Sequence, residues 1–121
     1  MSIQTIETMV TWLESNMTEN PCLADMSKFV GYSPYYCSSK FHETLGIPFK
    51  TYLKRRKLCL AAQDLKQTKE RIIDIAFKYG FTSHEAFTRS FVHEYGYSPS
   101  QYRKEEPILN LFQRPTIKQT E

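Results

Sequence analysis

Residues 72–102 read IIDIAFKYGFTSHEAFTRSFVHEYGYSPSQY, and this stretch decides the fold because a related stretch occurs earlier in the chain. The earlier copy, residues 23–52, reads LADMSKFVGYSPYYCSSKFHETLGIPFKTY. Matched positions lie 49 residues apart before the central turn and 50 apart after it, as in Gly31 with Gly80 and Phe41 with Phe91. Each copy combines a short helix, a glycine turn and a second helix that carries an inward phenylalanine. The sequence therefore predicts two helix-turn-helix units.

Apolar residues recur at helical spacing through most of the chain, so we expect an all-α fold of about seven helices. The expected helices cover residues 3–18, 23–30, a third opening at Ser33-Pro34, 48–66, 71–79, a sixth running to Tyr95, and 99–104. The helix over 48–66 is about 28 Å long at about 1.5 Å per residue, which is comparable to one turn of DNA at about 34 Å. We predict a first subdomain over 1–47, a linker helix over 48–67, a second subdomain over 68–106 and a tail over 107–121, which either docks loosely or is disordered.

Composition places few limits on the partner but excludes several protein classes. The 121 residues carry a net charge of +3, which is compatible with a nucleic-acid partner without demanding one. No apolar run is long enough to cross a bilayer, so we expect a cytoplasmic protein without a membrane partner. Cys22, Cys37 and Cys59 form no C-x-x-C pair and are expected to be reduced, mostly buried thiols.

An enzyme is not expected. The three histidines lack the spacing of metal ligands, and the four glycines stand at helix ends, so no phosphate-binding loop is present. We predict no catalytic residue, no metal and no cofactor.

Helical-wheel geometry sorts the second helix of each unit into an inward and an outward face. The inward residues are expected to be Cys37, Phe41 and Leu45 in the first unit and Phe87, Phe91 and Tyr95 in the second. The outward residues are Tyr35, Tyr36, Ser39, His42 and Glu43, with Ser38 at the border, and then His84, Glu85, Thr88, Arg89 and Val92. Arginine can donate to guanine and glutamate can accept from cytosine, so the second outward face is suited to reading bases.

The chain resembles the AraC/XylS family of bacterial transcription regulators, and within it the short standalone members of the multidrug and superoxide responses. The resemblance covers about residues 5–104 and is most specific over residues 73–81, 87–91, 96–99 and 102–103. It implies double-stranded DNA as the partner, read by two helices in successive major grooves, and activation of transcription through contact with RNA polymerase. We expect a monomer on an asymmetric site of roughly 20 base pairs, at the bacterial nucleoid.

Carried over position by position, the resemblance implies base contacts by Tyr35, Ser38, Ser39, His84, Glu85, Thr88 and Arg89. Contacts to the DNA backbone are expected from Ser33, Tyr36, Lys40, Lys54, Arg55, Arg56 and Ser83. Ser38 and Ser39 are shorter than the long polar side chains that relatives often carry there.

Other roles for these residues stay open. Glu85 has the spacing to close a capping box with Thr82, and Arg89 has the spacing for an ion pair with Glu85. The basic run at residues 54–57 also fits a solvated helix face. The competing function is a helical protein-interaction module on the same fold without DNA specificity, which the low net charge and the outward glutamates favour.

Overall fold

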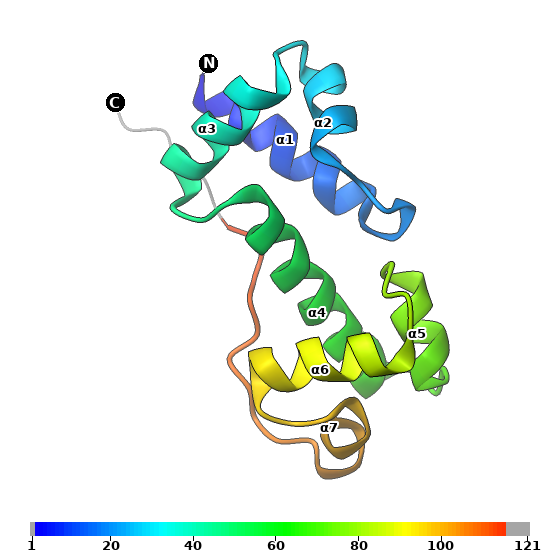
Figure 1. Ribbon diagram of the computed structural model, residues 1–121. Helices are drawn as coiled ribbons and strands as arrows, with labels where there is room; N and C mark the ends of the chain where they lie inside the picture. The colour runs from blue at the N-terminus through cyan, green and yellow to red at the C-terminus, as the bar shows by residue number, and fades with distance from the viewer. Residues whose placement is uncertain (1, 116–121) are drawn as a thin grey trace. The chain divides into compact units, whose positions relative to one another are not determined.

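The computed structural model describes residues 2–115, and every element of regular secondary structure in this part of the chain is a helix (Figure 1). Its helices are α1 (Ile3–Ser15), the short 3₁₀ helix η1 (Met17–Glu19), α2 (Leu23–Val30), α3 (Pro34–Leu45), α4 (Phe49–Gln67), α5 (Ile72–Lys78), α6 (His84–Tyr95) and α7 (Pro99–Glu105). The predicted all-α fold with seven α-helices is confirmed.

The chain divides into two compact units. Of the described residues, 2–53 together with 114–115 form the first unit, and Lys54–Gln113 form the second. α4 is one helix of 19 residues that carries the chain from the first unit into the second. The predicted boundaries of the subdomains at residues 47, 67 and 106 stay a prediction.

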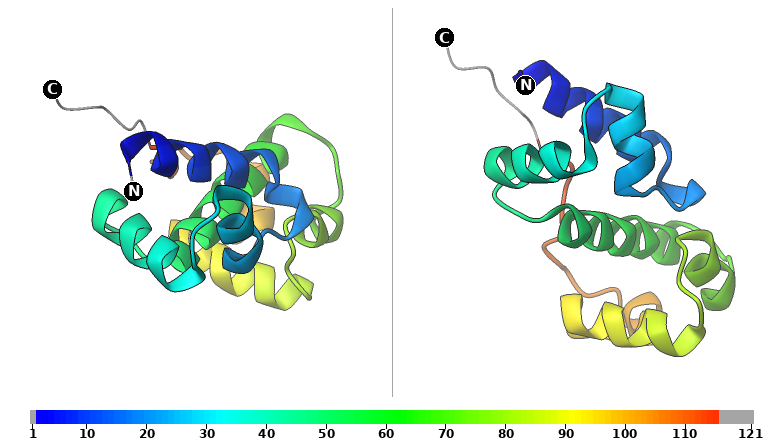
Figure 2. Two further views of the ribbon diagram at one scale, coloured as in Figure 1. Left: turned by 90° about the horizontal axis from the view of Figure 1, so that it is seen from above. Right: turned by 45° about the horizontal axis from the view of Figure 1, so that its top comes forward.

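The first unit is built from α1, α2 and α3, which contact one another (Figure 2). α1 presents Ile6, Met9, Val10 and Leu13 to the core, and all four are almost fully buried. The helix expected over residues 3–18 is α-helical only as far as Ser15. After Asn16 the chain continues as the 3₁₀ helix η1. Asn20 follows with a φ of +55°, a left-handed conformation that asparagine tolerates and that stops the helical path.

Both units contain the same turn between their helices. The N–H of Tyr32 donates to the Ser27 carbonyl at 3.2 Å, and the N–H of Phe81 donates to the Ala76 carbonyl at 3.0 Å. The glycine that precedes each of these aromatic residues has a φ of about +80°, which costs a residue without a Cβ little. The two glycines that the sequence repeat matched therefore perform the same task.

Serine side chains start the second helix of each unit. Ser33 accepts a hydrogen bond from the Tyr36 N–H at 3.2 Å, and Pro34 is the first helical residue, as expected. Ser83 accepts from the Ala86 N–H at 3.0 Å, so Ser83 is the N-cap of α6. The capping box that the spacing from Thr82 to Glu85 allowed is therefore not formed, because the helix begins one residue later than that spacing requires.

In the second unit, α6 contacts both α5 and α7, and the core is aromatic. The ring of Phe91 lies 5.7 Å from that of Phe87, 5.0 Å from Tyr95 and 5.7 Å from Tyr102, between ring centroids. The inward face predicted for α6 is confirmed for Phe87 and Phe91, which are fully buried, while Tyr95 is partly exposed. Offset and edge-on ring contacts of this kind stabilise a core beyond simple burial.

Residues 106–115 have no regular secondary structure but make specific contacts. Within the second unit, the Phe112 carbonyl accepts from Arg56 Nη1 at 2.6 Å, and the Phe112 ring lies 4.2 Å from the Arg55 guanidinium carbon. Within the first unit, Arg114 Nη2 donates to Thr11 Oγ1 at 2.8 Å. The tail is therefore docked as far as Arg114, and its residues 116–121 lie outside the described part.

Candidate nucleic-acid interface

The outward face of α6 carries four side chains that were predicted to contact bases. His84, Glu85 and Arg89 are exposed, while Thr88 is partly buried. Within residues 2–115, no hydrogen bond or ion pair engages the Arg89 guanidinium, so the ion pair with Glu85 that the spacing allowed is not formed. Both charged groups point into solvent from the first half of the helix, where recognition helices meet base edges.

Thr88 was predicted to lie on the outward face, but its hydroxyl is not available there. Its Oγ1 is buried and has no hydrogen-bond partner among the described residues. The residue keeps some exposure, which consequently belongs to atoms other than the hydroxyl oxygen. A threonine methyl group can contact the methyl group of thymine, so a base contact by Thr88 does not require its hydroxyl.

The corresponding face of α3 holds Tyr35, Ser38 and Ser39, the other predicted base contacts. Tyr35 is 86% exposed, Ser39 is exposed, and Ser38 is half-buried, as its border position on the helical wheel predicted. The inward residues Cys37 and Phe41 are fully buried. α3 is therefore oriented as predicted, with short side chains in the middle of its outward face.

Ser33 and Ser83 stand at the N-termini of α3 and α6 and were predicted to contact the DNA backbone. Each hydroxyl oxygen already accepts a backbone N–H, and its own O–H remains able to donate. The N-terminus of a helix also attracts anions through its unpaired N–H groups and the helix dipole. These two positions are chemically suited to a phosphate.

The predicted basic run on α4 is divided by the helical turn. Lys54 is exposed, whereas Arg55 donates to Glu94 at 2.8 Å and lies against the Phe112 ring. Burial lowers the pKa of the half-buried Lys57. Consecutive residues on a helix point about 100° apart, so four neighbouring cations cannot share one face.

Arg56 was predicted to contact a phosphate, and the structure contradicts this. The residue is only 5% exposed, and its Nη1 donates to the Phe112 carbonyl and approaches the Cys59 sulfur at 3.4 Å. A signal for this was present in the sequence, because Arg56 lies four residues after Tyr52 and three before Cys59, both fully buried. Those spacings place the arginine on the inward stripe of α4.

Tyr36 and Lys40 belong to a second small cluster on α3. The Lys40 ammonium lies 3.2 Å from Glu43 Oε2 and 5.8 Å from the centre of the Tyr36 ring, which in turn lies 5.5 Å from the Tyr32 ring. An exposed ion pair of this kind contributes at most about 1 kcal/mol and exchanges partners readily. Lys40 can therefore leave Glu43 for a phosphate at little cost.

Other kinds of site find less support. Among residues 2–115, no group of three or more histidine, cysteine and acidic side chains is arranged to hold a metal ion. In the same part of the chain, no helix is long and apolar enough to cross a membrane. Cys37 and Cys59 are buried as expected, but Cys22 is exposed just before α2.

Comparison with known proteins agrees with the geometry. The model of the helix-turn-helix domain family matches residues 26–105. The HTH-type transcriptional activator AarP of Providencia stuartii is 37% identical over 105 residues, which are 87% of this chain and 78% of AarP.

Solved structures share the architecture. An AraC-type transcriptional regulator from Chromobacterium violaceum is 25% identical, with a TM-score of 0.79 over 84% of this chain and 91% of that one. The DNA-binding domain of AdpA, crystallised with a target DNA, is 20% identical, with a TM-score of 0.77 over 83% of this chain and 90% of its own, and shares the fold. The chain thus belongs to the AraC-type helix-turn-helix family of DNA-binding transcription regulators.

Proposed function

We propose that this chain is a sequence-specific activator that inserts α3 and α6 into successive major grooves of double-stranded DNA. The observation that carries the proposal is the outward face of α6, where Glu85 and Arg89 are exposed and Arg89 has no ion-pair partner among residues 2–115. An arginine in the first half of a recognition helix can donate two hydrogen bonds to guanine. The relative AarP is named an activator, which supports the same sign of regulation here.

In this proposal the base contacts come from both helices. They are made by Tyr35, Ser38 and Ser39 on α3 and by His84, Glu85, Thr88 and Arg89 on α6. The backbone contacts come from Ser33, Tyr36, Lys40, Lys54, Arg55 and Ser83, with Arg56 removed because its side chain is buried. Phosphate contacts fix the register of the protein on the duplex, and base contacts choose the sequence.

The protein acts as a monomer in the cytoplasm, at the nucleoid, and activates transcription by touching RNA polymerase. Two recognition helices in one chain support the monomer, because a single chain then supplies what a dimer of simpler regulators supplies. It performs no catalysis. A titration at increasing protein concentration, followed by sedimentation of the complex, tests whether one chain occupies each site.

A salt titration on random duplex DNA tests the proposal directly. Lys40, Lys54 and Arg55 are the cationic backbone contacts, so the slope of log K against log salt should be about −3. Lys54→Ala should weaken all sequences alike and reduce that slope by about 1. Lys69→Ala is the matched control, because Lys69 is an exposed cation outside the proposed contacts.

The opposite result would identify the competing function. If the protein shows no affinity for random duplex at about 50 mM salt, where phosphate contacts are strongest, the DNA proposal fails. The helical protein-interaction module would then be the better account of the exposed glutamates on α3 and α6.

A further inference from the structure

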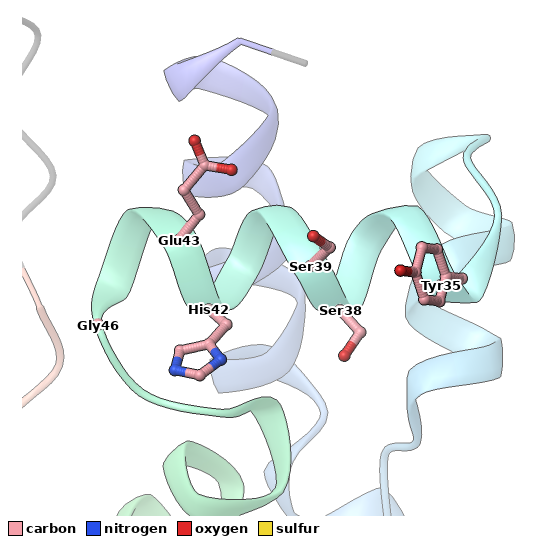
Figure 3. A pocket seen from close by; sticks show the side chains of 6 residues that line it. All are labelled: Tyr35, Ser38, Ser39, His42, Glu43 and Gly46. Atoms are coloured by element: carbon pink, nitrogen blue, oxygen red, sulfur yellow. The ribbon is translucent and has the colours of Figure 1, made fainter.

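The outward face of α3 is hollowed between two larger side chains. Short side chains occupy its middle, and Figure 3 shows this surface from close by. The hollow is lined by Tyr35, Ser38, Ser39, His42, Glu43 and Gly46. Because serine ends two bonds from the backbone, α3 can approach a partner surface closely at this point. The larger groups at the two ends, Tyr35 and His42, reach further than the serines.

His42 is an exposed polar group that the proposed contacts leave unused. Within residues 2–115 no hydrogen bond or ion pair engages its imidazole. A neutral imidazole offers one N–H donor and one acceptor, and the phenol of Tyr35 offers the same pair of functions. In Figure 3 the side chains of Ser38 and His42 project from the same side of α3, while Glu43 projects from the other.

The spacing of these two groups matches the spacing of bases. His42 follows Tyr35 by seven residues, which is two helical turns, so both side chains lie along one face. Seven residues rise by about 10.5 Å along a helix, and three base-pair steps of about 3.4 Å span nearly the same length. A helix lying along the major groove would therefore bring the two side chains to base pairs three steps apart.

The second unit lacks this possibility at the matched position. The repeat pairs His42 with Val92, at the offset of 50 that also pairs Ser39 with Arg89. Val92 is 42% exposed and has no hydrogen-bonding group. α6 thus carries a long polar side chain at Arg89 where α3 has the short Ser39, and α3 carries its longer polar side chain one turn later, at His42.

We propose that His42 is a specificity-determining residue, reading one base edge in the half-site of α3. Tyr35 reads a base pair three steps away, and the short Ser38 and Ser39 contact the intervening pairs with little preference among the bases. The inference rests on the proposed function, because it requires α3 to enter a major groove. It assigns to the first half-site a pattern of two specified base pairs around a permissive centre.

Selection from a random duplex pool tests the assignment, using the whole chain in three forms: wild type, His42→Ala and the control Thr44→Ala. Thr44 is exposed on the same turn of α3 but lies outside the hollow. We expect His42→Ala to lose the preference at one base pair and to bind the wild-type site about 3- to 10-fold more weakly, as for one hydrogen bond. Thr44→Ala should keep every preference.

Three results would overturn the proposal, and they are distinguishable. An unchanged preference in His42→Ala removes His42 from base reading, and an equal loss of affinity on all sequences makes it a phosphate contact instead. A wild type that enriches no sequence refutes the proposed function together with the inference. Helical circular dichroism of each variant separates these results from unfolding.

Discussion

The two helix-turn-helix units share their buried aromatic contacts and differ in what they expose. In the first unit the rings of Phe41 and Tyr52 meet edge to face at 5.3 Å, and in the second unit those of Phe91 and Tyr102 do so at 5.7 Å. The partners in each pair are matched by the same offset of 50 residues. Packing around this ring pair therefore holds both recognition helices in the same way.

The outward side chains, unlike the buried rings, differ between the two units. Where α6 carries Thr88 and Arg89, α3 carries Ser38 and Ser39. Inward side chains must fill a fixed space, because a core is close-packed and tolerates little change in volume. Outward side chains do not have to fit a core, so only binding to a partner limits which residues can stand there. The comparison indicates two units with one scaffold and two different reading surfaces.

The units also differ in the polar contacts around their scaffolds. In the second unit Asp64 accepts from Lys78 at 2.8 Å and from the Tyr79 hydroxyl at 2.7 Å, and Lys78 also donates to Glu70 at 2.7 Å. In the first unit the Tyr52 hydroxyl donates to Glu14 at 3.0 Å. Charge and pH should consequently act on the second unit through the Asp64 cluster.

The largest effect is expected at the buried ring pair. Phe41→Ala and Phe91→Ala should each lower the free energy of unfolding by about 3–5 kcal/mol, because each leaves a cavity where a fully buried ring lay. Urea denaturation followed by helical circular dichroism measures both. A loss below about 1 kcal/mol in one variant alone would break the equivalence of the two scaffolds.

The next effect separates the reading surfaces. Arg89→Ala should weaken binding to a selected site by about 1–3 kcal/mol and relax the preference at one position, whereas Ser39→Ala should change affinity by less than about 0.5 kcal/mol. Competition titrations with single-base variants of the site measure both changes. If the two substitutions cost the same, the units do not differ in the way proposed.

The helix caps should behave alike in the two units. Ser33→Ala and Ser83→Ala each remove one hydrogen bond to a helix N-terminus and should cost about 1 kcal/mol of stability. Ser83→Asp keeps a capping oxygen and serves as the control in thermal unfolding. If Ser83→Ala left the stability unchanged, Thr82 rather than Ser83 would be the N-cap of α6.

The smallest effect is a dependence on pH that arises in the second unit. Burial, assisted by the hydrogen bond to Asp64, raises the pKa of Tyr79 above its ordinary value, and burial does the same to the pKa of Tyr102. A phenol whose pKa is higher in the folded state stabilises the fold below its ordinary pKa of about 10, and this stabilisation is lost as the pH rises further.

Tyr79→Phe isolates the contribution of that residue. It should cost about 0.5–1.5 kcal/mol near neutral pH through the lost hydrogen bond, and it should flatten the decline of stability above about pH 10. Denaturation midpoints across this pH range measure the slope. The exposed Tyr35→Phe should keep the wild-type slope, and a variant at Tyr79 that also keeps it would contradict the assignment.

Local chemistry was enough to predict most of the fold. A glycine that must adopt a positive φ, a serine that can cap and a proline at the first helical position act within a few residues, so Gly31, Ser33 and Pro34 mark a turn and a helix start in the sequence itself. The long α4 was predicted over residues 48–66 and runs over Phe49–Gln67. The candidate base contacts rest on the resemblance and stay predictions.

At the start of α6 the sequence contains two possible N-caps and does not show which of them is used. Thr82 and Ser83 can both cap a helix, and Glu85 suited a box with the first. The structure starts α6 at His84, which leaves Ser83 as the cap and Glu85 exposed. The difference of one residue matters for function, because it turns Glu85 from a structural group into one available to a partner.

The helices and their ends follow from residues that lie close together in the chain, so they could be predicted from the sequence. The repeat could also be found there, because its two copies share the same pattern. Whether a basic side chain of α4 is buried or exposed depends on residues that lie far away in the sequence. Arg56 donates to the carbonyl of Phe112, 56 positions further on, and Arg55 is held by Glu94, 39 positions further on. A run of four basic residues looks uniform in the sequence, but the helical turn and these distant partners separate exposed Lys54 from buried Arg56. Tertiary packing decides which charges reach solvent, because burial depends on neighbours that only the folded chain brings together.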